Sequence, residues 1–310
     1  MAEKTGFCFG VQRAYTLALA STEMKDRALF SWGPLIHNLQ VVSFLESRGL
    51  KVISDLSEVV PASSVVIRSH GASPQIKKEL KRRGAQIIDA TCPFVKKAQS
   101  KLSQLEREGY QVLVFGDPGH PEVQALVGYA QSKIEVIQGP SDLASLALRK
   151  RVGMVAQTTQ READLREIVG CLLPKANELK VFNTICRSTV DRTEAALKVA
   201  READILFVVG GSDSANTGRL RDTCRKVLQN TYQIEACKEI DPRWLRGKSK
   251  IGVTAGASTP EWLVSEVVSW LKEMISEKAP RKTLKVFSTS QELGGTAAND
   301  RRDSSYEDRL

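Results

Sequence analysis

Three cysteines, each placed directly before a stretch of helical character, divide this chain into units of similar length. Cys8 precedes GVQRAYTLALA, Cys92 precedes PFVKKAQSKLSQLEREG, and Cys186 precedes RSTVDRTEAALKVARE. The two intervals between these cysteines are 84 and 94 residues. Free backbone N–H groups and the helix dipole at a helix start favour the thiolate form of a cysteine. The pattern therefore predicts three related units, each with one reactive thiol near a helix start.

Each unit continues in the same way, with an apolar strand that ends in polar residues. The first such strands are ALFSWGPLIHN, QVLVFGDPGHPEV and DILFVVGGSDSANT, and their polar ends at His37, His120 and Ser214 lie 29, 28 and 28 residues past their own cysteines. A second strand with a polar tip follows later in each unit, in SSVVIRSHGAS, RVGMVAQTTQ and KSKIGVTAGAST. Shared spacing of unlike residues is typical of internally repeated structural units.

The alternation of buried-type strands with amphipathic helices predicts parallel sheets with right-handed crossovers. We therefore expect an α/β fold of three small parallel-sheet lobes in a pseudo-threefold arrangement around a central cavity. The expected units are residues 9–92, 93–182 and 183–279, with residues 1–8 packed on the third. Residues 280–310 are polar and rich in Gly and Ser, which predicts a disordered tail.

Ligand-binding groups in open parallel sheets gather at the carboxyl ends of the strands. The chain has three histidines, His37, His70 and His120, and every one lies at such a strand end. A single histidine is more often a structural residue, but three at equivalent positions favour a shared binding role. With nearby hydroxyls and amides, and the Gly-rich turn in GGSDSANTGRL, they predict a donor-rich cup for a phosphate or diphosphate.

The chemistry of the three thiols is left open by their spacing. Three thiolates without a CxxC pair suit a zinc ion with an open position, and equally an iron–sulfur cluster with one iron that lacks a protein ligand. Glu122, directly after GHP, is a candidate proton donor in a closed cavity. We interpret the other cysteines, Cys171, Cys224 and Cys237, as packing residues.

Composition narrows the choice of partners. The net charge is +9, but the basic residues are dispersed along helices and are not interleaved with aromatic residues, which disfavours nucleic acid as a partner. The longest apolar runs are far shorter than a membrane span, so no membrane association is expected. The start MAEKTGFC has no apolar leader region, which makes the cytoplasm the default location.

Taken in order, several stretches resemble the 4-hydroxy-3-methylbut-2-enyl diphosphate reductase family over roughly residues 5 to 275. They are GFCFGVQRA, HN, SHGAS, DATCPFV, GHPEV, QTT, VVGGSDSANTGRL and VTAGAS. The resemblance implies a three-lobed, pseudo-threefold α/β enzyme with a [4Fe–4S] cluster. Its reaction would remove the hydroxyl of an allylic alcohol diphosphate as water, with two electrons and two protons, and yield isopentenyl and dimethylallyl diphosphates. A ferredoxin or flavodoxin would supply the electrons, and a basic surface suits such a donor.

The resemblance also implies roles for individual residues. The cluster ligands would be Cys8, Cys92 and Cys186. The unligated iron would bind the substrate hydroxyl as a Lewis acid. Glu122 would deliver a proton to the leaving oxygen, relayed with Thr158, and His120 would also move protons. The residues implied to bind the substrate are His37, His70, His120, Thr158, Ser214, Ala215, Asn216 and Ser258.

Two features depart from the family pattern. An apolar strand generally precedes the first cysteine, but MAEKT is too short and polar to form it. Either the start of the chain is truncated, or another segment, such as TLKVFS near residue 285, replaces the strand in the third sheet. Ala215 stands where the family often has Ser or Gly, so a hydroxyl contact would be replaced by a backbone N–H.

Two other functions stay open on the residues alone. A zinc-dependent hydrolase of a phosphorylated small molecule would use the same thiols, imidazoles and carboxylate. A non-catalytic iron–sulfur sensor that binds nucleic acid would explain the basic charge, but it leaves Glu122 and the hydroxyl-rich cup without a role.

Overall fold

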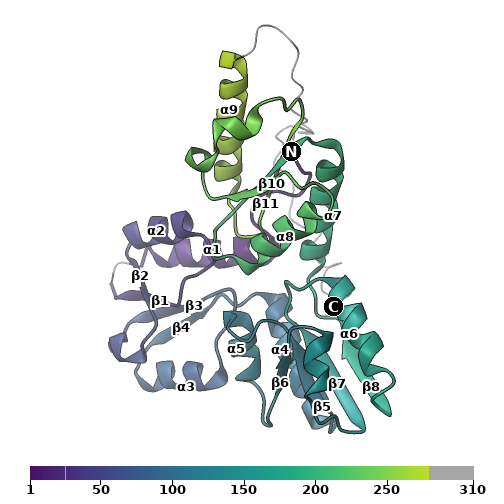
Figure 1. Cartoon of the computed structure of the whole chain (residues 1–310). Coiled ribbons are helices and arrows are strands. Elements are labelled where there is room, and N and C mark those ends of the chain that lie inside the picture. Colours follow the sequence, from purple (N-terminus) through teal and green to yellow (C-terminus); the bar gives the residue numbers. More distant parts are fainter. Residues whose placement is uncertain (25, 279–310) are drawn as a thin grey trace, which may run out of the picture.

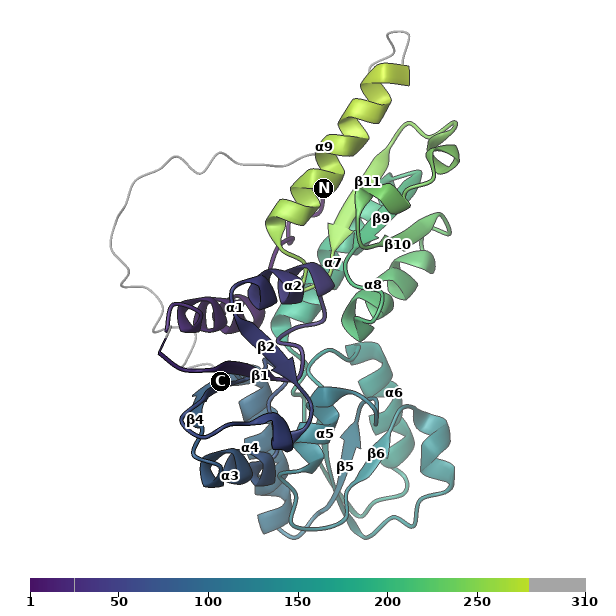
Figure 2. The same ribbon diagram turned by 90° about the vertical axis from the view of Figure 1, so that its left-hand side faces the viewer.

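Apolar runs of three to six residues form the strands, and every strand pairing recorded between them is parallel. The computed structural model describes residues 1–24 and 26–278. Within them the strands form three separate sheets, and each sheet with its helices makes one lobe (Figure 1). Figure 2 shows the third lobe above the other two, which lie side by side. The predicted fold of three parallel-sheet α/β lobes is confirmed.

The first lobe contains a four-stranded sheet in the order β2-β1-β3-β4. Its strands are β1 (Leu29–Trp32), β2 (Leu50–Ile53), β3 (Ser64–Ile67) and β4 (Gln86–Asp89). Its helices are α1 (Phe9–Ser21), α2 (Leu39–Ser47) and α3 (Pro74–Arg82), with a short 3-10 helix at Leu56–Glu58.

The second lobe repeats this topology in the order β6-β5-β7-β8. Its strands are β5 (Gln111–Phe115), β6 (Glu135–Ile137), β7 (Arg151–Ala156) and β8 (Glu178–Phe182). Its helices are α4 (Pro93–Arg107), α5 (Pro121–Val127) and α6 (Glu162–Leu172), with a 3-10 helix at Pro140–Ala144.

The third lobe keeps the same strand order but has three strands, β10-β9-β11. They are β9 (Ile205–Val209), β10 (Thr231–Ile234) and β11 (Ile251–Ala255). Its helices are α7 (Arg187–Glu202), α8 (Ala215–Arg225) and α9 (Glu261–Lys278), with 3-10 helices at Cys237–Glu239 and Pro242–Leu245. The repeated strand order explains the repeated spacing in the sequence. The exact boundary residues of the three units, 9–92, 93–182 and 183–279, stay a prediction.

Both faces of each sheet are buried, which is why the strands are apolar at successive positions. On β3, Val65 and Val66 belong to two different hydrophobic clusters because neighbouring side chains of a strand point to opposite faces. The central strand β9 is buried at all five residues for the same reason. Helices cover both faces, so each lobe has a two-sided core.

The edge of the third sheet, where a fourth strand was expected, is occupied by the first residues of the chain. The backbone N–H of Ala2 donates to the carbonyl of Val253 on β11 at 2.9 Å, and Met1 packs against the core of this lobe. A single backbone hydrogen bond does not make this segment a β-strand, so the sheet has three strands. The alternative segment TLKVFS lies outside the described residues, as does the predicted tail.

A buried arginine fixes this N-terminal segment to the third lobe. Arg192 of α7 is 5 % exposed, and its guanidinium donates to the carbonyls of Lys4, Gly6 and Ala255 at 2.9, 3.0 and 3.2 Å. Because the segment leads directly to Cys8, Arg192 also sets where the first thiol lies.

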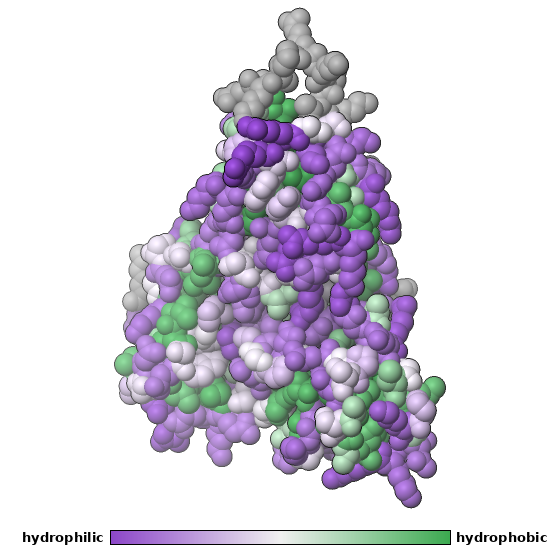
Figure 3. Space-filling model, in the orientation of Figure 1, coloured by the Kyte–Doolittle hydropathy of each residue, from purple (hydrophilic) through white to green (hydrophobic). Residues whose placement is uncertain are grey.

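Hydrophilic residues predominate on the face shown in Figure 3, where hydrophobic residues form separate patches. Across the described part of the chain, every helix is either too short or too polar to serve as a membrane span.

We expect Arg192→Met to lower the free energy of unfolding by about 2–4 kcal/mol, because three carbonyls lose a charged donor while the apolar stem is kept. Urea unfolding measures the loss, and amide hydrogen exchange should show faster exchange at residues 2–8. Arg187→Met is the matched control, since Arg187 lies on the same helix but its side chain is 75 % exposed. Equal losses in the two variants would contradict a special role for Arg192.

Candidate active site

The three cysteines that divide the sequence are the N-cap residues of three long helices. Cys8 occupies the N-cap position of α1, Cys92 that of α4 and Cys186 that of α7. None of the three thiols makes a capping hydrogen bond to the helix backbone. Pro93 occupies the first turn of α4, where its missing N–H costs nothing. All three cysteines line one cavity, so the convergence expected from the repeat is present in the fold.

A repeated backbone hydrogen bond positions each cysteine. The N–H of Cys92 donates to Ser69 O at 2.9 Å, that of Cys186 to Thr158 O at 2.9 Å, and that of Cys8 to Ala257 O at 3.0 Å. The three acceptors lie in the equivalent loops after β3, β7 and β11. Each thiol is therefore held against a strand tip.

The starts of α1 and α4 lie in direct contact at this point. A Cβ built on Gly10 would collide with the Sγ of Cys92 and would lie 3.0 Å from its Cβ. Only a glycine leaves room for this thiol. The site thus depends on the absence of a side chain one turn away from the first cysteine.

Burial disfavours free thiolates in this cavity. It raises the pKa of Cys92 to about 12 and that of Cys186 to about 11, and the charge of the Cys8 thiolate raises both pKa values further. The backbone N–H groups at the helix starts act in the opposite sense but are outweighed. The helix starts thus act toward the thiolate, as expected, but burial decides the direction of the pKa shift at Cys92 and Cys186. Three thiolates here require a compensating positive centre.

The three histidines form a compact cup beside the thiols. The ring centroids of His37, His70 and His120 are 4.8 to 5.5 Å apart, and their nitrogen atoms lie within 4.8 Å of one another. Nε2 of His37 and Nδ1 of His70 are buried and have no hydrogen-bond partner. Two such orphaned atoms from facing rings indicate a ligand with several hydrogen-bonding atoms.

Two imidazoles of the cup, those of His70 and His120, are favoured in the neutral form. Burial lowers the pKa of His70 well below 6.5 and that of His120 to about 4, and the positive charge of neighbouring histidines lowers both pKa values further. His120 Nδ1 accepts from the N–H of Glu122 at 3.1 Å, which leaves its other nitrogen as the N–H donor. His37 Nδ1 lies 3.5 Å from Asp213 Oδ2.

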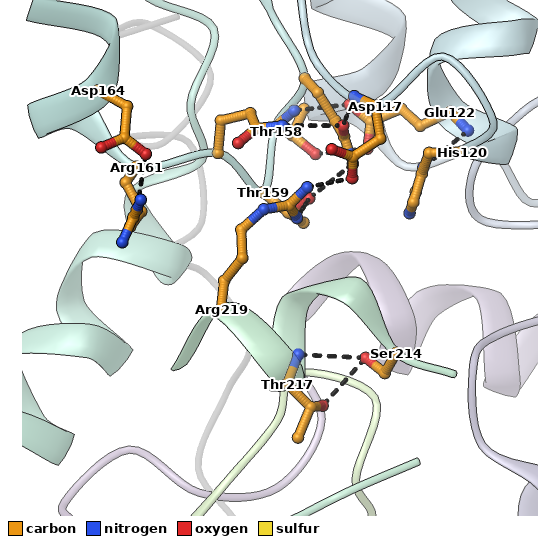
Figure 4. A network of polar contacts seen from close by, with 12 residues as sticks. Asp117, His120, Glu122, Thr158, Thr159, Arg161, Asp164, Ser214, Thr217 and Arg219 are labelled. Atoms are coloured by element: carbon orange, nitrogen blue, oxygen red, sulfur yellow. Dashed lines mark hydrogen bonds and ion pairs between the residues drawn. The ribbon is translucent and has the colours of Figure 1, made fainter. Parts of the chain in front are cut away.

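Glu122 is a buried carboxyl group that faces the same cavity. It is 2 % exposed, and its two oxygens accept from Thr158 N at 2.6 Å and Thr158 Oγ1 at 2.8 Å (Figure 4). Burial raises the pKa of Glu122, although the bonds from Thr158 act in the opposite sense. A carboxyl group with a raised pKa next to a hydroxyl is suited to proton transfer.

The third lobe contributes polar groups from two loops. Ser214 caps α8, and its Oγ accepts from the N–H and the hydroxyl of Thr217 at 3.3 and 3.0 Å (Figure 4). Ser258 Oγ donates to the carbonyl of His37 at 3.0 Å. Ser214, Asn216 and Ser258 all line the cavity.

The structure brings together all but one of the predicted site residues. Ala215, the first residue of α8, is the exception, because it does not line the cavity. The three other cysteines pack in hydrophobic clusters of the second and third lobes. Sequence reasoning missed four hydroxyl residues of the lining, which are Ser69, Thr159, Ser188 and Thr189. Their positions in the sequence could have indicated them, because each lies next to a predicted strand tip or in the first turn after a cysteine.

An ion pair between lobes closes one side of the site. Arg219 of α8 in the third lobe pairs with Asp117, which follows β5 in the second, and Arg219 Nη1 donates to Thr159 Oγ1 at 3.4 Å (Figure 4). The side chains of Arg219 and Asp117 are 18 % and 33 % exposed. Partial burial makes this pair stronger than a surface pair.

A larger open groove lies elsewhere, beside α1, α2 and the start of α9. Its volume is about 660 Å³ and its lining includes Phe7, Tyr15, Phe44 and Trp262. Glu261 is the one titratable carboxyl group in that lining. We therefore assign the chemistry to the central cavity, where thiols, imidazoles and a carboxyl group converge.

These features define an α/β protein of three repeated parallel-sheet lobes around a thiol- and imidazole-lined centre. A family model described as LytB protein matches residues 1–272, and the chain belongs to this family. Among its curated relatives are proteins named 4-hydroxy-3-methylbut-2-enyl diphosphate reductase. Those from Geobacter metallireducens and Geobacter sulfurreducens are 44 % and 45 % identical over 278 residues, which is 90 % of this chain and 98 % of theirs.

Solved structures agree with this assignment. A reductase described as the terminal enzyme of the non-mevalonate pathway is 41 % identical with a TM-score of 0.68, covering 88 % of this chain and 98 % of its own. The E-1-hydroxy-2-methyl-but-2-enyl-4-diphosphate reductase of Plasmodium falciparum is 26 % identical with a TM-score of 0.85, covering 95 % and 93 %. The family resemblance predicted from the sequence motifs is confirmed.

We expect a double-mutant cycle of Asp117→Ala and Arg219→Ala to give a coupling energy of about 1–2 kcal/mol in urea unfolding, since the pair is partly buried and joins two lobes. The control is the pair Glu162 and Arg166 within α6, where the arginine side chain is 80 % exposed and the coupling should be below about 0.5 kcal/mol. A coupling at Asp117 and Arg219 no larger than this control would show that the pair does not hold the lobes together.

Proposed function

We propose that this chain reduces (E)-4-hydroxy-3-methylbut-2-enyl diphosphate to isopentenyl diphosphate and dimethylallyl diphosphate. The observation that carries the proposal is the convergence of the thiols of Cys8, Cys92 and Cys186 with three imidazoles and the carboxyl of Glu122 on one cavity. Support also comes from relatives with this reductase name, of which the chain covers 98 %.

The cofactor that fits the thiols best is a [4Fe–4S] cluster. Among the described residues, the group of three ligating side chains close enough to share one ion consists of histidines and contains no cysteine. Zinc holds its sulfur ligands at about 2.3 Å, so three thiolates on one zinc would lie about 3.8 Å apart. Because the three cysteines line one cavity but form no such group, we favour a multi-iron centre over a single zinc ion. When bound, the cluster would supply the electrons and a Lewis-acidic iron for the substrate hydroxyl.

The protein's own part in the reaction is proton delivery and positioning. Burial raises the pKa of Glu122 and so favours its protonated carboxyl, which gives the proton to the leaving oxygen; the Thr158 hydroxyl bonded to it at 2.8 Å relays the replacement. His120 is the N-cap residue of α5, the helix that carries Glu122, and it extends the proton path. Burial of these groups keeps water from competing with the substrate for the proton.

Neutral donors bind the diphosphate. We assign this role to the imidazoles of His37, His70 and His120 and to the polar groups of Thr158, Ser214, Asn216 and Ser258. The orphaned nitrogens of His37 and His70 support the assignment, because an anion would satisfy both. Ala215 offers only its backbone N–H at the start of α8.

A ferredoxin or flavodoxin is the proposed electron donor. These are small acidic redox proteins, and a net charge of +9 favours their association with this chain. All six cysteines are free, which suits a reducing compartment such as the cytoplasm.

A zinc-dependent hydrolase of a phosphorylated molecule is the second candidate, favoured by the closeness of the three imidazole rings. Anaerobic purification with metal and sulfide analysis separates the two. Brown protein with iron and acid-labile sulfide supports the reductase, whereas colourless protein with zinc supports the hydrolase.

We expect Cys8→Ser to lose most of its iron and acid-labile sulfide, because one of three thiolate ligands is removed. Iron and sulfide analysis with electron paramagnetic resonance measures the loss. Cys224→Ser is the control: Cys224 is buried in α8 and does not line the cavity, so that variant should keep its cluster. The same loss in both variants would mean that the ligands are misassigned.

We expect Glu122→Gln to bind substrate and keep its cluster while its kcat falls about 100- to 10,000-fold, as for removal of a general acid. Single-turnover and steady-state kinetics measure the effect. Glu167→Gln, on the exposed face of α6 in the same lobe, should react at the normal rate. Near-normal turnover of Glu122→Gln would exclude Glu122 as the proton donor.

A further inference from the structure

An arginine beside the histidine cup has no counter-ion. Arg68 directly follows β3 and precedes His70 by two residues. In the described part of the chain, its side chain makes neither a hydrogen bond nor an ion pair, and its Nε is buried without a partner. Burial lowers its pKa, with no carboxylate acting in the opposite sense. The residue as a whole is only half-buried, but a buried guanidinium nitrogen without a partner is a donor that an anion would satisfy.

The loop after β1 is shaped to receive this guanidinium. A Cβ built on Gly33 would lie 2.5 Å from Arg68 Nη1 and 2.9 Å from its Cζ. Gly33 also has a φ of +71°, a conformation that other residues rarely adopt. The N–H of Gly33 donates to Ile53 O at 2.8 Å, and its carbonyl accepts from Ser31 Oγ at 2.7 Å. The guanidinium therefore lies in a built niche and is not simply a surface side chain.

The charge of Arg68 acts on the cup itself. It lowers the pKa values of His70 and His120, so both imidazoles lie within its field. The other arginine that acts on this cup, Arg219, is already neutralised by Asp117. Arg68 does not itself line the cavity, but it stands two residues before His70, which does.

From this geometry we propose that Arg68 supplies the fixed positive charge that retains the diphosphate in the histidine cup. Neutral imidazoles donate hydrogen bonds but carry no charge, whereas the guanidinium stays charged at every working pH. The same charge repels a divalent cation from the three imidazoles. The three histidines therefore bind an anion and do not form a metal site. Arg68 is a positioning residue, since it does not itself line the cavity.

This inference rests on the proposed function, and its test separates the two. Anaerobically purified holoenzyme is titrated with inorganic diphosphate by calorimetry, and the melting temperature is measured with and without the anion. Arg68→Gln should bind diphosphate about 10- to 100-fold more weakly, as for loss of a charged partner. The KM for the allylic diphosphate should rise by the same factor, with kcat nearly unchanged because Glu122 and the thiols are intact.

Two further variants distinguish charge from structure. Arg68→Lys keeps the charge and should recover most of the affinity. Arg82→Met removes one charge from the exposed surface of α3 in the same lobe and should bind diphosphate normally. A merely structural role of Arg68 would lower the melting temperature without the anion but would leave the shift produced by diphosphate unchanged.

The proposal is overturned if Arg68→Gln binds diphosphate as tightly as Arg82→Met does. If Arg68→Gln does not fold, Gly33→Ala replaces it, because that change displaces the guanidinium from its niche while keeping the charge in the chain. Normal affinity in that variant overturns the proposal as well. If the wild-type holoenzyme neither binds diphosphate nor reduces the allylic substrate, the proposed function itself fails; if it does both while Arg68→Gln is normal, only the role of Arg68 fails.

Discussion

The architecture depends on one repeated backbone interaction, the hydrogen bond from each N-cap cysteine to the carbonyl of a neighbouring strand tip. These bonds, from Cys8, Cys92 and Cys186, join the start of each lobe's first helix to the end of an adjacent sheet. Because every lobe makes one such bond, three otherwise separate sheets share a centre. The thiols meet there because the backbone brings them together.

The two ends of this centre have opposite electrostatic needs. At the thiol end, burial raises the pKa values of Cys92 and Cys186, so the thiolates need a cationic cofactor. At the histidine end, the neutral imidazole of His70 and the unpartnered ring nitrogens of His37 and His70 favour an anion. A ligand with a diphosphate at one end and a hydroxyl for an iron at the other satisfies both. Glu122 lines the same cavity and is the proposed proton donor.

Hydrogen bonds and an ion pair between lobes stabilise the arrangement of the three lobes. The residues that make them belong to no obvious sequence motif. Arg219 and Asp117 join the third lobe to the second, and Ser258 joins it to the first through the carbonyl of His37. The N-terminal segment, which Arg192 anchors, passes from the third lobe into α1. Such ties are formed by single side chains whose partners lie far away in sequence.

Repetition made much of this protein predictable from its sequence. The spacing of Cys8, Cys92 and Cys186, together with strand tips at His37, His70 and His120, predicted three parallel-sheet lobes and a shared cavity lined by these residues. Periodicity reports on local structure, and a repeat places equivalent residues at equivalent strand ends. The helix-start argument for thiolates was also local: the backbone N–H groups do lower the pKa of Cys92 and Cys186, but burial, which the argument did not include, outweighs them.

Tertiary structure alone decided the rest. Ala2 bonds to the edge of β11, and Ala215 does not line the cavity that Ser214 and Asn216 line. The isolation of Arg68 and the pairing of Arg219 are invisible in the sequence, because whether a charge has a partner depends on residues brought close by folding. The sequence determines which side chains stand at each strand end. How deeply those side chains are buried, and whether their charges are paired, depends on how the folded lobes pack together.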